Sequence, residues 1–176
     1  MRSPAKTKTY ITLSRSEIEI CIVAPSQFVI DHQQQLLPNW NISVSYLILV
    51  LQRSSISLKQ PTTKVAQEKN QLRAKFIRFG CSLIFALQDQ GAKSDLFDPR
   101  TGCALLANSD LALDDNAVIG ATLGYSVISY QQCSLLTHPV WEQNVYPSVI
   151  ATSASSKAIN VCLNETISNL NWRLKY

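Results

Sequence analysis

The sequence predicts an α+β fold, in which helices pack on a mainly antiparallel sheet. This class rests on short strand-like segments, on segments with helical spacing of apolar residues, and on turn residues that suit hairpins. The predicted order is strand, helix, strand, helix, four short strands and a final helix. Apolar residues make up 46% of the 176 residues and charged ones 16%, which excludes intrinsic disorder and a charge-rich coiled coil.

The first half of the chain begins with a predicted arm. Residues 1–16 carry four cations before the first acid and are expected to be a flexible basic arm, which leaves residues 17–176 as a single domain. Residues 17–23 alternate apolar and polar side chains, as a half-buried strand does. Residues 27–37 are expected to form a short helix that ends before a proline. Residues 43–52 are rich in β-branched and aromatic residues, which is typical of a central strand.

The strongest helical pattern runs over residues 64–89. Apolar side chains recur there at helical spacing, and Gly91 follows at the position that a glycine often takes after a helix. Residues 95–97 and 103–107 are predicted to be the strands of a hairpin, because the turn between them has a proline near its start and a glycine at its end. The polar residues 109–115 are expected to form a loop or a single turn.

Residues 116–141 contain no Asp, Glu, Lys or Arg. Glycines and glutamines interrupt the segment and argue against a transmembrane helix. It is therefore interpreted as sheet that is either buried on both faces or covered by a partner, with strands at residues 125–130 and 134–136. A further strand is expected at residues 145–152, and the apolar spacing of residues 155–170 predicts the last helix.

The composition argues against several kinds of site. The five cysteines lack the short spacings of a zinc site, and four of them have apolar periodic surroundings that are typical of small core residues. The cations of residues 64–89 are interpreted as a solvated helix face, so no nucleic-acid or membrane partner is expected. No export signal is visible, and a cytoplasmic protein with reduced thiols is expected.

Two groups of acids are better explained as turn residues than as sites. Asp110, Asp114 and Asp115 could be a hard-cation loop, but they lack the ligand pattern of a calcium site. Asp95 and Asp98 could be an acid–base pair, although an Asp before Pro commonly bonds its own backbone. The sequence contains no Ser-His-Asp elbow, and its five glycines form no phosphate-binding loop.

One constellation could carry chemistry: Cys133, His138 and Trp141, at the end of the charge-free segment. A thiol beside an imidazolium can become a nucleophilic thiolate, and a thiolate is also a donor for soft metal centres. Judged from the residues alone, Cys133 is more often a core cysteine, and His138 before a proline is more often a loop histidine. No cation neighbours Cys133 in sequence, so metal coordination itself would remove the thiol proton.

The second half of the chain resembles a known family. The motifs that carry the resemblance stand in the same order and at near-identical spacing: Lys75-Phe76-Ile77, Ala86-Leu87, Gly91, Asp95-x-x-Asp98-Pro99-x-x-Gly102, Leu123-Gly124-Tyr125-Ser126-Val127, Cys133, His138-x-x-Trp141 and Ile150-Ala151-Thr152. They resemble the C-terminal domain of the methylmalonic aciduria and homocystinuria type D protein family, a cobalamin-trafficking adaptor of the cblD type. The resemblance is close over residues 64–155 and looser over residues 17–51.

The resemblance implies a modified nitroreductase-like fold without a flavin site and without catalytic turnover of its own. It implies a cblC-type cobalamin-processing partner and transfer of cobalamin to methionine synthase or methylmalonyl-CoA mutase. This chain is expected to contact cobalamin through the partner complex, and it is not expected to bind flavin. The alternative function is a flavin-dependent oxidoreductase of the nitroreductase type, against which the lack of a visible cluster for the flavin phosphate counts.

In the family, a cysteine after the Gly-aromatic-Ser-Val motif is implicated in coordinating the cobalt of partner-bound cobalamin. Family members have two adjacent cysteines at this point, where this chain has Gln132-Cys133. The candidate ligand carried over is Cys133, with His138 and Trp141 shaping the site and the interface. If the family ligand is the first of the pair, Gln132 occupies its position.

Overall fold

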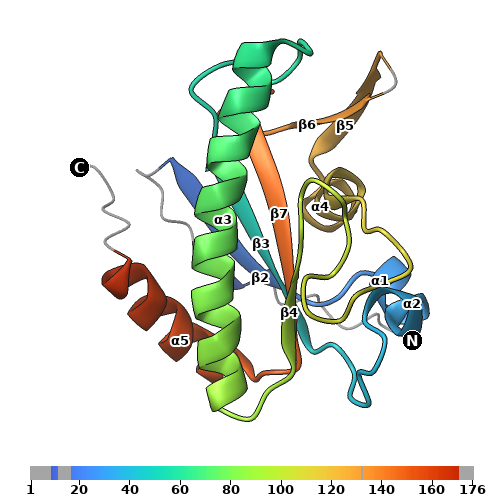
Figure 1. Ribbon diagram of the computed structural model, residues 1–176, viewed down its shortest axis with the longest axis vertical. Helices are drawn as coiled ribbons and strands as arrows, with labels where there is room; N and C mark the ends of the chain where they lie inside the picture. The colour runs from blue at the N-terminus through green and yellow to red at the C-terminus, as the bar shows by residue number, and fades with distance from the viewer. Residues whose placement is uncertain (1–8, 12–16, 132, 171–176) are drawn as a thin grey trace, which may run out of the picture.

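Figure 1 shows a sheet with a long helix across it and a hairpin that projects to one side. This computed structural model describes residues 9–11, 17–131 and 133–170. The antiparallel sheet has the strand order β1 (Thr9–Ile11), β2 (Ile18–Val23), β3 (Tyr46–Arg53), β7 (Val145–Thr152) and β4 (Ser94–Phe97). The hairpin pairs β5 (Ser126–Tyr130) with β6 (Cys133–Thr137). The described helices are α1 (Gln27–Asp31), α2 (Gln33–Leu36), α3 (Thr63–Asp89), α4 (Asp115–Leu123) and α5 (Ser156–Asn169).

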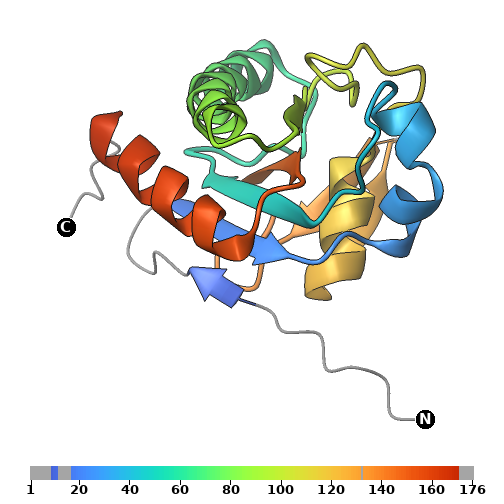
Figure 2. The same ribbon diagram turned by 90° about the horizontal axis from the view of Figure 1, so that it is seen from below.

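Helices cover both faces of the sheet, which makes a three-layered molecule (Figure 2). Successive residues of a strand point to opposite faces, so alternate side chains of β3 enter different cores. Ile48 and Val50 join the core under α3 and α5, whereas Leu47, Leu49 and Leu51 join the core shared with α1, α2 and α4. The predicted α+β class with an antiparallel sheet is confirmed, and so is the predicted central strand.

The ends and the buried stripe of α3 match the sequence prediction. The Thr62 side chain accepts a hydrogen bond from the Val65 backbone N–H at 3.2 Å and so caps the first turn. The chain leaves the helix through Gly91, whose φ of 85° is the left-handed conformation that glycine adopts without strain. The buried positions recur every three or four residues and comprise Val65, Leu72, Phe76, Phe79, Gly80, Leu83, Ile84 and Leu87.

Two predictions in the first part of the chain are corrected. Thr9–Ile11, which the sequence placed in the flexible arm, pair with β2 as an edge strand; the remaining arm residues lie outside the described residues. The helix expected over residues 27–37 is two short helices, because the chain turns at His32. There the His32 Nδ1 lies 2.9 Å from the Phe28 carbonyl oxygen, so the side chain competes for a helix carbonyl.

The hairpin predicted over residues 95–107 is wrong in its second strand. β4 pairs with β7 instead, and only an isolated bridge links β4 to the segment after the turn. The Asp95 carboxylate accepts hydrogen bonds from the backbone N–H groups of Leu106 and Ala107, at 3.0 and 2.7 Å. A buried side chain therefore takes the N–H groups that a strand ladder would need.

The interpretation of residues 116–141 as sheet is wrong for its first part, which belongs to α4. The Asp114 side chain accepts a hydrogen bond from the Ala117 N–H at 3.0 Å, and Gly124 ends the helix with a φ of 77°. β5 and β6 are strands, as predicted. The side chains of β5 are mostly exposed, however, so burial on both faces is wrong for this strand.

Candidate functional site

The β5–β6 hairpin carries Cys133 at its free end. Cys133 begins β6, pairs with Tyr130 across the hairpin, and has an exposed side chain. The Gln60 side chain donates a hydrogen bond to the Tyr130 hydroxyl at 3.4 Å, and the Lys59 ammonium lies 4.7 Å from the centroid of the Tyr130 ring. The thiol is thus accessible, and it stands beside a tyrosine that contacts the loop before α3. Gln132 lies outside the described residues.

The other cysteines are less accessible. Cys21 and Cys162 are buried, as expected of core residues, and Cys81 and Cys103 are half-buried. Burial raises the pKa of the Cys81 and Cys162 thiols, which favours their protonated form. Of the five cysteines, Cys133 is the one whose side chain is exposed, and the interpretation of Cys133 as a core residue is wrong.

His138 lies at the opposite end of β6, where the hairpin joins the rest of the fold. Its side chain is 4% exposed. The Nδ1 atom accepts hydrogen bonds from the backbone N–H groups of Val140 and Trp141, at 3.1 and 3.0 Å. The Nε2 atom lies 2.9 Å from a carboxylate oxygen of Glu19 on β2. Because Nδ1 accepts, the neutral ring carries its proton on Nε2 and donates it to Glu19.

Glu19, on β2, contacts the residue before β5 and the residue after β6, at the root of the hairpin. Its second carboxylate oxygen accepts hydrogen bonds from the Tyr125 hydroxyl at 3.1 Å and from the Cys21 thiol at 3.4 Å. The Trp141 ring stacks on His138 with their centroids 4.2 Å apart and packs against the core shared with α4. These contacts fix the root of the hairpin to β2, which determines the direction in which the hairpin projects.

The structure therefore separates the predicted constellation into two parts. Cys133 stands at the tip of the hairpin, and His138 and Trp141 stand at its root. An extended strand rises roughly 3.3 Å per residue, so the five steps from Cys133 to His138 span roughly 16 Å. The geometry does not form a Cys–His nucleophile pair, and both ring nitrogens of His138 are already hydrogen-bonded.

Asp95 in β4 and Asp98 directly after it are both used within the fold. Asp98 accepts hydrogen bonds from the Arg73 guanidinium on α3, with 2.7 Å between Arg73 Nε and Asp98 Oδ1. The Arg73 guanidinium holds the pKa of Asp98 below its ordinary value. Asp98 also accepts the Arg100 backbone N–H at 3.0 Å, as the turn interpretation predicted. Burial raises the pKa of Asp95, although backbone N–H groups surround its carboxylate.

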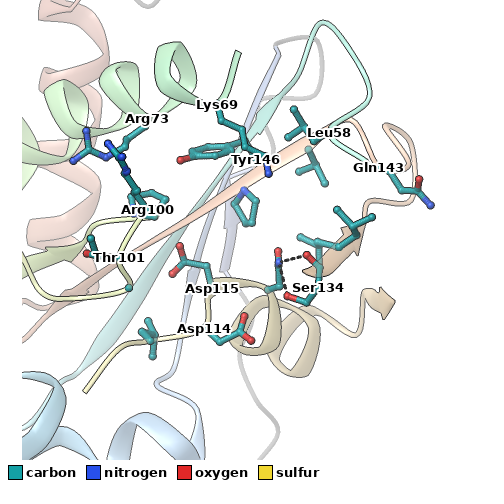
Figure 3. Close-up of a pocket in the computed structure, with 18 of the residues that line it drawn as sticks. Leu58, Lys69, Arg73, Arg100, Thr101, Asp114, Asp115, Ser134, Gln143 and Tyr146 are labelled. Atoms are coloured by element: carbon teal, nitrogen blue, oxygen red, sulfur yellow. Dashed lines mark hydrogen bonds between the residues drawn. The ribbon is translucent and has the colours of Figure 1, made fainter. Parts of the chain in front are cut away.

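A cavity of about 610 Å³ lies beside the hairpin (Figure 3). Its walls come from α3, the turn at residues 98–102, the start of α4, β6 and β7. Ser134 and Leu135, the two residues after Cys133, line it. Alternate residues of a strand share a face, so Cys133 is on the same face of β6 as Leu135. The exposed thiol therefore belongs to the residue that directly precedes this part of the cavity wall.

Asp115 is buried in the wall of the cavity. It is the first residue of α4, is 9% exposed, and its Oδ1 has no hydrogen-bond partner among the residues that the structure describes. Figure 3 shows its carboxyl group pointing into the space between α4 and Tyr146. Burial is the main cause that raises the pKa of Asp115 well above its ordinary value, and the charges of Asp114 and Asp98 add to the effect. The protonated form of this carboxyl is therefore favoured in the folded protein.

Asp115 predicts a pH dependence of stability. The folded state binds the Asp115 proton more tightly than the unfolded state, so this residue lowers the free energy of unfolding as the pH rises above about 4, the ordinary pKa of Asp. We expect Asp115→Asn to be more stable than the wild type at pH 7, by about 1 kcal/mol or more, and this gain to disappear near pH 4. Urea unfolding at both pH values measures it. The exposed Asp110→Asn is the control, and an equal gain at both pH values would contradict the prediction.

Comparison with known proteins identifies the family. The family model of the methylmalonic aciduria and homocystinuria type D protein matches residues 2–162. The chain belongs to this family. The Cobalamin trafficking protein CblD of Rattus norvegicus is 24% identical over 155 residues, which are 86% of this chain and 51% of the rat protein. The human protein of the same name is 24% identical over 151 residues, or 84% of this chain and 50% of that protein.

The CblD protein of Gallus gallus is 22% identical over 142 residues, or 79% of this chain and 47% of the chicken protein. The chain therefore spans about half the length of the curated relatives it matches. The predicted resemblance to the type D family is confirmed, and cobalamin trafficking is the role for which these relatives are named. None of the helices in the described part of this chain is long and apolar enough to cross a membrane.

For this type D family member, the sequence alone singled out Cys133, His138 and Trp141 but missed their surroundings. Glu19, which holds His138, lies 119 residues away in sequence, so no local pattern indicated the pairing. Asp115 was assigned to a surface turn. The signal that it belongs to a helix was present, since Asp114 and Gly124 are typical cap residues ten positions apart.

Proposed function

We propose that this chain is a non-enzymatic adaptor in cobalamin processing, which presents the Cys133 thiol to the cobalt of cobalamin held by a cblC-type partner. The observation that carries the proposal is the position of Cys133, exposed at the tip of a projecting hairpin. Coordination to a metal removes the thiol proton, and a thiolate is a suitable donor for a soft or borderline centre. Cys133 would hold the cobalt through its sulfur, and the cofactor itself would supply the metal chemistry.

The surface around Cys133 suits burial by a partner protein. β5 carries no charged side chain, and Val127 and Ile128 are 40% and 38% exposed. The cores of protein interfaces are depleted of charge and enriched in aromatic residues. Tyr130, beside Cys133, supplies such an aromatic ring. A partner can therefore cover the hairpin without desolvating a charge on β5, which supports the interpretation of this segment as sheet covered by a partner.

In this proposal, His138 and Trp141 position the hairpin rather than contact cobalt. Their contacts with Glu19 and with each other fix its root, so the tip meets the partner in one orientation. The proposal includes a modified nitroreductase-like arrangement, supported by the antiparallel sheet with helices on both faces. It also includes transfer of the cofactor to methionine synthase or methylmalonyl-CoA mutase.

The test is a titration of the protein into a cobalamin-loaded cblC-type partner while the visible spectrum is followed. The wild type is expected to shift the cobalamin bands as sulfur enters the coordination sphere. Cys133→Ser should still form the complex, measured by size-exclusion chromatography, and should lose the shift. Cys103→Ser, which removes a half-buried thiol, is the matched control and should keep it. A full shift with Cys133→Ser would remove Cys133 from the mechanism.

A further inference from the structure

We infer that the cavity beside Cys133 binds a carboxamide group. The ligand we assign is an amide side arm of the corrin ring, and this assignment rests on the proposed function of Cys133.

The cavity has the size of a ligand site and walls of mixed charge. Pockets for small ligands measure roughly 300–1,000 Å³, and the 610 Å³ found here lies within that range. Lys69, Arg73 and Arg100 line one part, and Asp114 and Asp115 line another. Arg73 is already paired with Asp98, so a purely anionic ligand would meet Asp114 and a purely cationic one would meet Lys69 and Arg100. A neutral group with both a donor and an acceptor fits both walls.

Asp115 indicates which neutral group this is. Its Oδ1 is buried and finds no hydrogen-bond partner within the described part of the chain, which costs stability unless a ligand supplies one. Burial raises the pKa of this carboxyl, so the protonated form is favoured and offers one O–H donor and one acceptor side by side. A primary carboxamide offers the complementary acceptor and donor at the same spacing. The two groups can therefore pair through two hydrogen bonds.

The opposite wall completes the recognition of an amide oxygen. Figure 3 shows Tyr146 and Arg100 across the cavity from Asp115. Burial raises the pKa of Tyr146, so its hydroxyl stays protonated at neutral pH and can donate a hydrogen bond to the amide oxygen. The Asn116 side chain is not free for this task, since it donates to the backbone and side-chain oxygens of Ser134 at 3.0 and 2.9 Å. These two hydrogen bonds fix the start of β6, next to Cys133, to α4.

The cofactor of the proposed function carries this chemistry. The periphery of the corrin ring bears acetamide and propionamide arms. The 610 Å³ cavity can hold one such arm, and Ser134 and Leu135, which directly follow Cys133, line it. With one arm held by Asp115, the corrin ring would lie outside the cavity, toward the Cys133 thiol. This chain would then contact the cofactor at two points, the amide arm and the cobalt.

The experiment uses dicyanocobinamide, a corrin that keeps its amide arms and has cyanide at both axial positions of cobalt. Binding to the chain is followed by the ¹H–¹⁵N spectrum, through the backbone N–H groups of Gly102, Leu113 and Asn116 around the cavity. We expect saturable shifts with the wild type. Asp115→Ala should weaken binding by about fivefold or more, whereas Asp115→Asn should keep it within about twofold, because an amide still offers a donor and an acceptor. The exposed Asp110→Ala is the control for a lost acid outside the cavity.

The outcomes separate this inference from the function on which it rests. Because cyanide blocks the cobalt, Cys133→Ser should leave dicyanocobinamide binding unchanged while abolishing the spectral shift in the partner complex. If the spectral shift depends on Cys133 but dicyanocobinamide does not move the cavity signals, the cavity inference is overturned and the adaptor function stands. If propionamide moves these signals and dicyanocobinamide does not, the cavity takes an amide from another molecule, and the corrin assignment is overturned.

Discussion

Asp95→Ala is expected to lower the free energy of unfolding by about 3–5 kcal/mol, the largest loss we expect from one polar side chain of this protein. Asp95 is 1% exposed, and its carboxylate accepts the backbone N–H groups of Leu96, Leu106 and Ala107 at 2.8, 3.0 and 2.7 Å. Alanine leaves these N–H groups without that acceptor, and each buried, unsatisfied donor costs about 1–3 kcal/mol. Urea unfolding followed by tryptophan fluorescence measures the change.

Asp95→Asn is the matched variant for this prediction. The raised pKa of Asp95 shows that burial outweighs the surrounding N–H groups as an influence on the charged form. Asparagine removes that buried charge and keeps one oxygen acceptor, so its loss of stability should be smaller than that of alanine. The same two variants report on the backbone at Leu106 and Ala107, which the Asp95 carboxylate holds. A loss below about 1 kcal/mol for Asp95→Ala would contradict this account.

The parts of the fold that could be predicted are those whose own residues decide the outcome. α3 carries a long apolar stripe with a cap at its start and a glycine after its end. In β3, residues 47–51 are all apolar and buried, as expected of a strand that is covered on both faces. The hairpin strands β5 and β6 were also predicted from their own residues. In each case the local pattern and the tertiary packing agree.

The parts that could not be predicted depend on side chains from elsewhere. Residues 103–107 have the composition of a strand, but the Asp95 carboxylate takes the N–H groups of Leu106 and Ala107. α4 has few polar residues to mark a solvent face, since one side packs on the sheet and another meets the hairpin. The exposure of Cys133 likewise depends on how Glu19, far away in sequence, anchors the root of the hairpin through His138.

Gly102→Ala is the second large effect that we expect, and it connects the stability of the fold to the cavity. Gly102 has a φ of 73°, and a Cβ there would lie 2.5 Å from the Leu113 carbonyl oxygen and 3.0 Å from the Ala112 Cβ. The Leu113 N–H donates to the Gly102 carbonyl at 2.8 Å, so neither backbone segment can move without disturbing that hydrogen bond. The left-handed conformation costs an alanine about 1–2 kcal/mol, and the overpacking adds about 1–3 kcal/mol.

Gly91→Ala separates these two costs. Gly91 has a φ of 85°, but a Cβ there would meet no atom within 4 Å, so this variant should lose only the conformational part. We expect Gly102→Ala to be less stable than Gly91→Ala by about 1–3 kcal/mol in urea unfolding. Gly102 and Leu113 also line the cavity, so Gly102→Ala should weaken dicyanocobinamide binding while Gly91→Ala leaves it unchanged. Equal stability of the two variants would mean that the turn at residues 98–102 can move away from Leu113, and the cavity would then lack the rigid wall that selective binding of an amide requires.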